Sequence, residues 1–209
     1  MLSRKQLAGG LLLGSLGLGF FGYWWFDEPQ VKNVPIVQTG PIVFFGDSLV
    51  EGVGASPGKD MPSLLSVSLE EPVLNYGVAG DTTRLALLRL DAVLETKPRL
   101  VLVLLGGNDF LRQIERSETA DNLERIIAQL QKEGAAVLLL GVRSGIVSGG
   151  SDALYETVAK DTEAAYERDV LKGIFGNPSL MSDAIHPNDR GYAKIVERLL
   201  PTLQKLLGK

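Results

Sequence analysis

The chain has 209 residues, no cysteine and one histidine, and 45% of its residues are hydrophobic and 22% charged. These counts exclude disulfides, thiol nucleophiles, cysteine-based metal sites and metal sites built from several histidines. The formal net charge is −4, and no basic run lies along a helix or between aromatic residues. Nucleic acid is therefore not an expected partner, and the length fits one domain with a short appendage.

The first predicted element is the uncharged stretch at residues 8–26. As a helix it would be about 28 Å long, close to the ~30 Å hydrocarbon core of a bilayer. Arg4 and Lys5 precede it, so the positive-inside rule places the N-terminus in the cytoplasm and the following chain outside. The aromatic cluster from Tyr23 to Phe26 fits an interfacial belt at the outer end. A cleaved signal peptide is the alternative, although no A-x-A cleavage site is present.

We therefore expect residues 1–28 to be a single-pass anchor in the inner (cytoplasmic) membrane, or an uncleaved signal. Residues 29–40 contain two prolines and several polar residues and predict a linker. Residues 41–209 then form the domain, which would face the periplasm or the cell exterior. Cleavage of the N-terminal segment would instead give a secreted protein.

Short apolar runs alternate with helical patterns along this domain. The apolar runs are bounded by Gly or Pro and predict buried parallel strands at residues 42–45, 73–75, 100–105 and 137–140. The helical patterns lie at residues 62–71, 82–96, 123–130, 153–168 and 192–200. Such alternation predicts a three-layer α/β/α sandwich with a mostly parallel sheet. The segment at residues 169–182 is short for a further strand.

Polar or glycine-rich segments follow each predicted strand, where open α/β sheets form their binding sites. They contribute a hydroxyl at Ser48, flexible backbone at Gly80 and a carboxamide at Asn108. The single histidine, His186, lies three residues after Asp183, so a turn would place both side chains on one face. Ester cleavage needs a nucleophile, a base, a group that orients the base, and donors for an oxyanion. These residues are candidates for all four roles.

Four segments of the chain resemble the sequence blocks of the SGNH (GDSL) hydrolase family, in matching order and spacing. They are Gly46-Asp47-Ser48-Leu49, Gly80, Gly106-Gly107-Asn108-Asp109, and Asp183-Ala184-Ile185-His186-Pro187. The similarity covers about residues 40–205 and is closest to bacterial acyl-thioesterases, lysophospholipases and arylesterases. It implies a flavodoxin-like sandwich with a five-stranded sheet and no metal or organic cofactor.

The resemblance also implies roles for individual residues. Ser48 would be the nucleophile and His186 the base, oriented by Asp183. The backbone N–H groups of Ser48 and Gly80 and the side chain of Asn108 would form the oxyanion hole. From the residues themselves, Asp47 is expected to be a capping or turn residue and Asp109 a structural support for its loop.

Arg143 and Ser144 follow the fourth predicted strand. They either line the substrate site, where Arg143 would meet an anionic group, or belong to a solvated connector. A second serine, Ser56, sits in a G-x-S-x-G match, but no strand leads into it, so it is expected to be a loop serine.

The sequence thus predicts a membrane-tethered serine esterase or thioesterase that acts on amphiphilic acyl esters such as lysophospholipids. Two alternatives use the same fold. One is an O-acetylesterase acting on carbohydrate or peptidoglycan, and the other is a non-catalytic acyl-binding domain.

Overall fold

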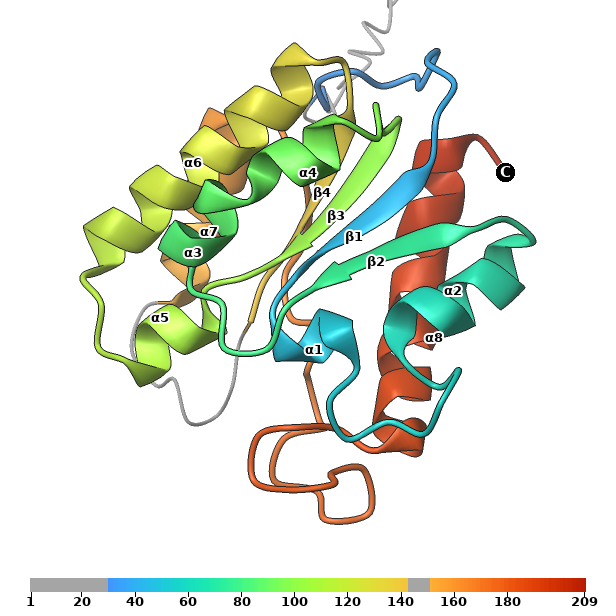
Figure 1. Cartoon of the computed structure of the whole chain (residues 1–209), viewed down its shortest axis with the longest axis vertical. Coiled ribbons are helices and arrows are strands. Elements are labelled where there is room, and N and C mark those ends of the chain that lie inside the picture. The colour runs from blue at the N-terminus through green and yellow to red at the C-terminus, as the bar shows by residue number, and fades with distance from the viewer. Residues whose placement is uncertain (1–29, 143–150) are drawn as a thin grey trace, which may run out of the picture.

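Five parallel strands form the centre of the molecule, seen in a computed structural model that describes residues 30–142 and 151–209 (Figure 1). The strand order is β2-β1-β3-β4-β5, and every pair is parallel. The strands are β1 Ile42–Gly46, β2 Val73–Gly77, β3 Leu100–Leu104, β4 Ala136–Leu140 and β5 Ala165–Glu167. The predicted three-layer sandwich with a five-stranded sheet is confirmed.

Helices cover both faces of this sheet. One layer holds α2 (Met61–Leu69) and α8 (Asp189–Leu207), and the other holds α3 (Thr83–Leu88), α4 (Leu90–Leu94), α6 (Arg116–Lys132) and α7 (Ser151–Asp161) (Figure 1). Two one-turn helices, α1 (Ser48–Glu51) and α5 (Gly107–Leu111), directly follow β1 and β3. No helix in the described ranges is both long and apolar enough to cross a bilayer, and the predicted membrane span at residues 8–26 lies outside those ranges.

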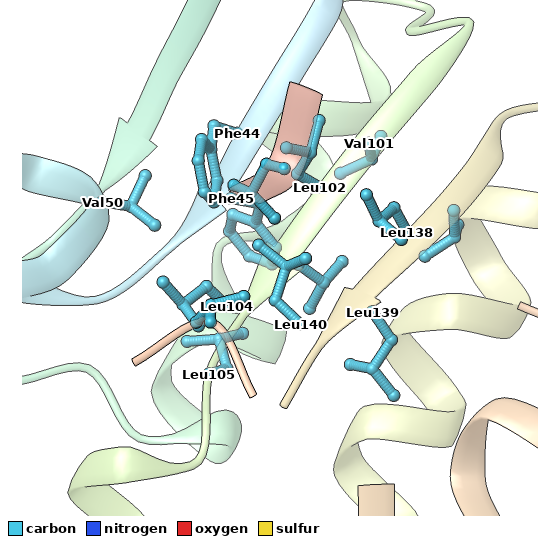
Figure 2. Packing of buried hydrophobic residues seen from close by; sticks show 14 of the residues in the cluster. Phe44, Phe45, Val50, Val101, Leu102, Leu104, Leu105, Leu138, Leu139 and Leu140 are labelled. Carbon is cyan, nitrogen blue, oxygen red and sulfur yellow. The ribbon is translucent and has the colours of Figure 1, made fainter. Parts of the chain in front are cut away.

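The core lies on the three central strands. All five residues of β1, β3 and β4 are buried, because helices cover both sheet faces at these strands. Figure 2 shows how the aromatic rings of Phe44 and Phe45 and the aliphatic side chains of β3 and β4 fill the space beside the sheet. The outer strand β2 is largely half-buried, which fits its edge position.

The register brings three strand ends to one level. Gly46, the last residue of β1, pairs with Gly77 of β2 and with Leu104 of β3. The residues that follow these strands therefore meet at one edge of the sheet. A side chain at Gly77 would lie 2.0 Å from the backbone nitrogen of Glu51, so the close packing of α1 on β2 requires glycine at this position.

Two helix predictions were wrong in detail. The pattern at residues 153–168 predicts one helix, but the helix ends at Asp161 and residues 165–167 form β5. Glu163, in the turn between them, has a positive φ of 54°, which an α-helix cannot continue through. The pattern at residues 82–96 predicts one helix, but Arg89 separates α3 from α4.

Candidate active site

Ser48 lies at the carboxyl edge of the sheet, as the first residue of α1. Asp47 caps this helix, since its Oδ1 accepts a hydrogen bond of 3.0 Å from the backbone N–H of Leu49. The capping role predicted for Asp47 is confirmed. The strand-to-helix turn leaves the hydroxyl of Ser48 facing His186, with 3.1 Å between Ser48 Oγ and His186 Nε2.

The other ring nitrogen of His186 contacts Asp183. Asp183 Oδ2 lies 2.8 Å from His186 Nδ1, and Asp183 Oδ1 accepts hydrogen bonds of 2.8 Å from the backbone N–H groups of Ile185 and His186. The bond to the His186 ring and these two backbone bonds lower the pKa of Asp183 to about 2. Asp183 is therefore a carboxylate at neutral pH, and it favours the tautomer with a proton on Nδ1.

Hydrogen bonds within the loop that carries His186 stabilise its conformation. The carbonyl oxygen of His186 accepts hydrogen bonds from the backbone N–H of Ser182, at 2.9 Å, and from its hydroxyl, at 3.0 Å. Next to this loop, the hydroxyl of Tyr192 in α8 donates to the carbonyl of Val53, just after α1, at 2.7 Å. These bonds hold the imidazole in place relative to Ser48, although the two residues are 138 positions apart in the chain.

Asn108 links the two backbone segments that carry Ser48 and Gly80. Its Nδ2 donates to Asp47 Oδ2 at 3.3 Å and to the carbonyl of Asp81 at 2.9 Å. Asp47 directly precedes Ser48, and Asp81 directly follows Gly80. In the described part of the chain, the backbone N–H groups of Ser48 and Gly80 have no acceptor. All three predicted donor residues thus belong to one connected set, with two backbone N–H groups available to a ligand.

The buried carboxylate of Asp109 stabilises the segments that carry Asn108 and Gly80. Its carboxylate accepts from the backbone N–H of Thr83 at 2.8 Å and from the Thr83 hydroxyl, and its side chain is 1% exposed. Thr119 and Asn122 of α6 complete the buried network through bonds to Asp109 and to Thr83. The network joins α5 to the start of α3, which confirms the structural role predicted for Asp109.

Arg89 also shapes the site, although no motif in the sequence indicates this role. Its guanidinium pairs with Asp81 at 2.6 Å and donates to the carbonyls of Tyr76 and Gly46 at 3.1 and 2.9 Å. It thereby ties the ends of β1 and β2 to the segment that follows Gly80. The one available signal is its position, a lone cation in the apolar run Leu85-Ala86-Leu87-Leu88-Arg89-Leu90.

Asp47 is an unusual carboxyl group, because it is 3% exposed and, among the residues that the structure describes, His186 is the one basic group that acts on it. Burial raises its pKa from 3.8 to about 6, assisted by the charges of Asp81 and Asp109 and opposed by the Leu49 N–H and His186. Since the pKa is raised in the folded state, the fold favours protonated Asp47. This group therefore destabilises the fold as pH rises from about 4 to about 6.

We expect Asp47→Asn to remove this pH-dependent destabilisation. A shift of about two pKa units corresponds to roughly 2–3 kcal/mol, so the free energy of unfolding of the variant, relative to wild type, should rise by that amount between pH 4 and pH 8. Urea unfolding across this pH range measures the difference. Ser48→Ala leaves Asp47 in place, so its stability should follow the wild-type pH dependence. A constant difference between Asp47→Asn and wild type at all pH values contradicts the assignment.

Two hollows lie at this edge of the sheet. A small one is lined by Ser48, Asn108 and His186, together with apolar side chains of Phe110, Leu111, Val142, Phe175 and Ile185. A larger cavity of about 620 Å³ adjoins it and shares Gly107, Phe110, Leu111 and Val142. The larger one continues over Ile114, Leu154 and Tyr155. Its size is that of a typical small-molecule site.

Three further predictions concern Arg143 with Ser144, the absence of a metal site, and Ser56. Arg143 and Ser144 lie outside the described residues. Within residues 30–142 and 151–209, no group of three or more His, Asp or Glu side chains is arranged to hold a metal ion. Ser56 lies in a loop and its backbone N–H donates to Asp189 at 2.7 Å, as expected for a loop serine.

Comparison with known proteins gives the family. Residues 44–194 match the model of the GDSL-like lipase/acylhydrolase family. The chain is 33% identical over 178 residues to the esterase TesA of Pseudomonas aeruginosa, with 79% of this chain and 89% of the relative covered. It is 31% identical over 176 residues to thioesterase 1/protease 1/lysophospholipase L1 of Escherichia coli, with 80% and 85% covered.

Solved structures agree with the sequence comparison. A crystal structure of TesA superposes with a TM-score of 0.76 at 32% sequence identity and covers 80% of this chain and 99% of its own. The strand order, the matched residues and these relatives lead to one family assignment. The chain belongs to the GDSL-like lipase/acylhydrolase (SGNH) family and is a hydrolase of carboxylic esters.

Proposed function

We propose that this protein hydrolyses acyl esters and thioesters by nucleophilic catalysis at Ser48. The observation that carries the proposal is the continuous hydrogen-bonded chain from Ser48 Oγ through the His186 ring to Asp183. In the first step Ser48 Oγ attacks the acyl carbonyl carbon while His186 Nε2 accepts the hydroxyl proton. The imidazolium that forms is stabilised by the Asp183 carboxylate.

The negative charge of the tetrahedral intermediate develops on the former carbonyl oxygen. In our proposal the backbone N–H groups of Ser48 and Gly80 donate to this oxygen. Asn108 donates to it through the amide hydrogen that now points to Asp47 Oδ2, which is 3.3 Å from Asn108 Nδ2, while the shorter bond from Asn108 to the Asp81 carbonyl is kept. His186 then protonates the leaving alcohol or thiol. Water, deprotonated by His186, hydrolyses the acyl-Ser48 ester and regenerates the hydroxyl.

The larger cavity adjoins the hollow that contains Ser48. This cavity supports the proposal that the substrate carries an acyl chain. Its wall contains the apolar side chains of Phe110, Leu111 and Ile114, which a hydrocarbon chain would cover. Amphiphilic acyl esters, such as lysophospholipids, combine such a chain with a polar head that remains in water. The relatives named esterase and thioesterase/lysophospholipase are consistent with this substrate class.

We also propose that the chain is held in the inner membrane by residues 8–26, with the hydrolase domain facing the periplasm or cell exterior. The support is the uncharged length of this stretch, the preceding Arg4 and Lys5, and the aromatic cluster at its outer end. N-terminal sequencing of the mature protein tests it, because a new N-terminus beyond residue 20 would indicate a secreted enzyme after signal cleavage.

A panel of aryl esters from acetyl to palmitoyl, with lysophospholipid and acyl-thioester substrates, tests the substrate proposal. We expect activity on medium and long chains, and Ser48→Ala should abolish it. Ile114→Trp should narrow the cavity and lower the rates for long chains by about tenfold or more, while the acetyl ester rate stays within about twofold. Val67→Trp, on the exposed face of α2, is the matched control and should leave the whole profile unchanged.

Two outcomes would overturn the proposal. Activity confined to acetyl esters would identify an O-acetylesterase of carbohydrate or peptidoglycan. Equal rates for wild type and Ser48→Ala would mean that the site is not a hydrolase site, as in a non-catalytic acyl-binding domain.

A further inference from the structure

The segment between the proposed anchor and β1 is fastened to the body of the domain. Residues 30–41 run across the end of the sheet where the strands begin, drawn in blue in Figure 1. The backbone N–H of Lys32 donates to the carbonyl of Glu163 at 2.9 Å. The side-chain amide of Asn33 donates to the carbonyls of Gln131 and Ala135, both at 2.9 Å.

Further contacts continue along the same segment. Val31 and Ile36 pack against the hydrophobic core. Arg99 donates through its backbone N–H to the carbonyl of Pro41 at 3.1 Å and through its guanidinium to the carbonyl of Gly40. The chain is thus attached to the domain from Val31 onwards, which leaves few residues free to act as a tether.

The acceptors of these bonds all lie at one end of the molecule. Gln131 and Ala135 flank the turn from α6 into β4, and Glu163 lies in the turn before β5. Ser48 follows the opposite end of β1, and α1 lies at the other end of the sheet from residues 30–41 in Figure 1. From Pro41 to Ser48 the chain advances seven residues, so the two ends are separated by about 20 Å.

The free tether is short compared with the domain. Five peptide units join Phe26, the last residue of the proposed span, to Val31, and they reach at most about 18 Å. A domain of about 180 residues has a radius of gyration of roughly 16 Å, hence a radius of about 20 Å and half a circumference of about 60 Å. To lay the Ser48 edge on the bilayer, the tether would have to pass around much of that half-circumference.

We infer that, in the membrane-anchored protein, the Ser48 site opens away from the bilayer that holds the anchor. The inference rests on the proposed anchor and refines the proposed substrate class. The substrates are acyl esters that reach the site from the aqueous side as monomers. Lipids embedded in the anchoring bilayer are out of reach, since the end of the domain with residues 30–41 faces that bilayer.

The absence of native cysteine allows a direct test with the full chain in phospholipid vesicles. Single-cysteine variants Glu133→Cys and Val78→Cys place one fluorescent label at each end of the sheet; Glu133 is exposed in the turn before β4, and Val78 is exposed after β2. We expect a quencher on the lipid headgroups to quench the Glu133→Cys label at least about threefold more than the Val78→Cys label. Equal quenching, or stronger quenching at position 78, overturns the inference.

Sedimentation separates this failure from failure of the anchor. We expect the full chain to pellet with vesicles after a wash at high salt and alkaline pH. If it stays in the supernatant, the anchor proposal is wrong, and the orientation inferred from that anchor is wrong as well. If it pellets and the Val78→Cys label is quenched, only the orientation is wrong, and the anchor remains.

A lengthened tether gives a functional readout of the same inference. Insertion of about 40 Gly/Ser residues between Glu28 and Pro29 adds a root-mean-square span of roughly 35 Å. We expect hydrolysis of lysophospholipid in the same vesicle to rise at least tenfold, while hydrolysis of a soluble aryl ester is unchanged. Equal lysophospholipid rates with short and long tethers would contradict the inference.

Discussion

We expect the double variant Ser48→Ala, His186→Ala to be as active as either single variant, with kcat lowered about 10⁶-fold in all three. The nucleophile is activated only when Ser48 Oγ and His186 Nε2 are both present, 3.1 Å apart. Removal of one group therefore removes the contribution of the other. His186 is the single histidine of the chain, so no second imidazole is available as a base.

Asp183→Asn should lower kcat by a smaller factor, about 10⁴-fold, because the imidazole is still present and loses only its tautomer preference and its negatively charged partner. Initial rates on a soluble aryl ester measure all four variants, and Ser56→Ala is the matched serine control, since that hydroxyl is in a surface loop. Ser56→Ala should keep the wild-type kcat. If the double variant lost the product of the two single losses, Ser48 and His186 would act independently, and the proposed mechanism would be wrong.

The sequence predicted most of the fold because the sheet is parallel and covered on both faces. Buried strands of this kind are continuous apolar runs with sharp limits, such as Leu100–Leu104 between Pro98 and Gly106. The candidate site followed from the same property. Ser48, Gly80 and Asn108 follow the ends of β1, β2 and β3 within four residues, and these strand ends lie at one level, which brings the three residues together.

The short elements β5, α1 and α5 were not predicted from the sequence, for physical reasons. The strand β5 has three residues, Ala165–Glu167, which is too few to show a period of two. The residues before it continue the apolar spacing of a helix, and the turn between them depends on the backbone of Glu163 rather than on Gly or Pro. The one-turn helices α1 and α5 are likewise shorter than two helical turns, so no hydrophobic period exists for them.

Arg89 and the electrostatics of Asp47 depend on contacts between distant segments. Arg89 meets the carbonyl of Gly46, 43 positions away in the chain. The pKa of Asp47 is raised by burial and by the charges of Asp81 and Asp109. The residues next to Asp47 in the sequence indicate neither its burial nor these charged neighbours. Patterns in a sequence report periodicity and turn chemistry, whereas these properties arise only when the strand ends are assembled.

Asn108→Ala should lower kcat by about 10²–10³-fold and leave KM within about twofold, as expected for a donor that binds mainly the charged intermediate. The structure sharpens this expectation. The Asn108 amide has two hydrogens, and the bond to the Asp81 carbonyl at 2.9 Å holds it beside Gly80. The second hydrogen takes part in the bond to Asp47 Oδ2, which is longer, with 3.3 Å between Nδ2 and Oδ2, and the developing oxyanion would replace this bond.

Asn108→Asp separates donation from packing, because it keeps the shape of the side chain but cannot donate when ionised and adds a negative charge beside Asp47. We expect it to be at least as impaired as Asn108→Ala. Gln38→Ala, which removes an exposed amide at the far end of the sheet, should keep the wild-type kcat and KM. Steady-state kinetics on an aryl ester measures all three variants. A change in KM alone for Asn108→Ala would show that Asn108 binds the ground state, and the oxyanion would then have only the backbone N–H groups of Ser48 and Gly80 as donors.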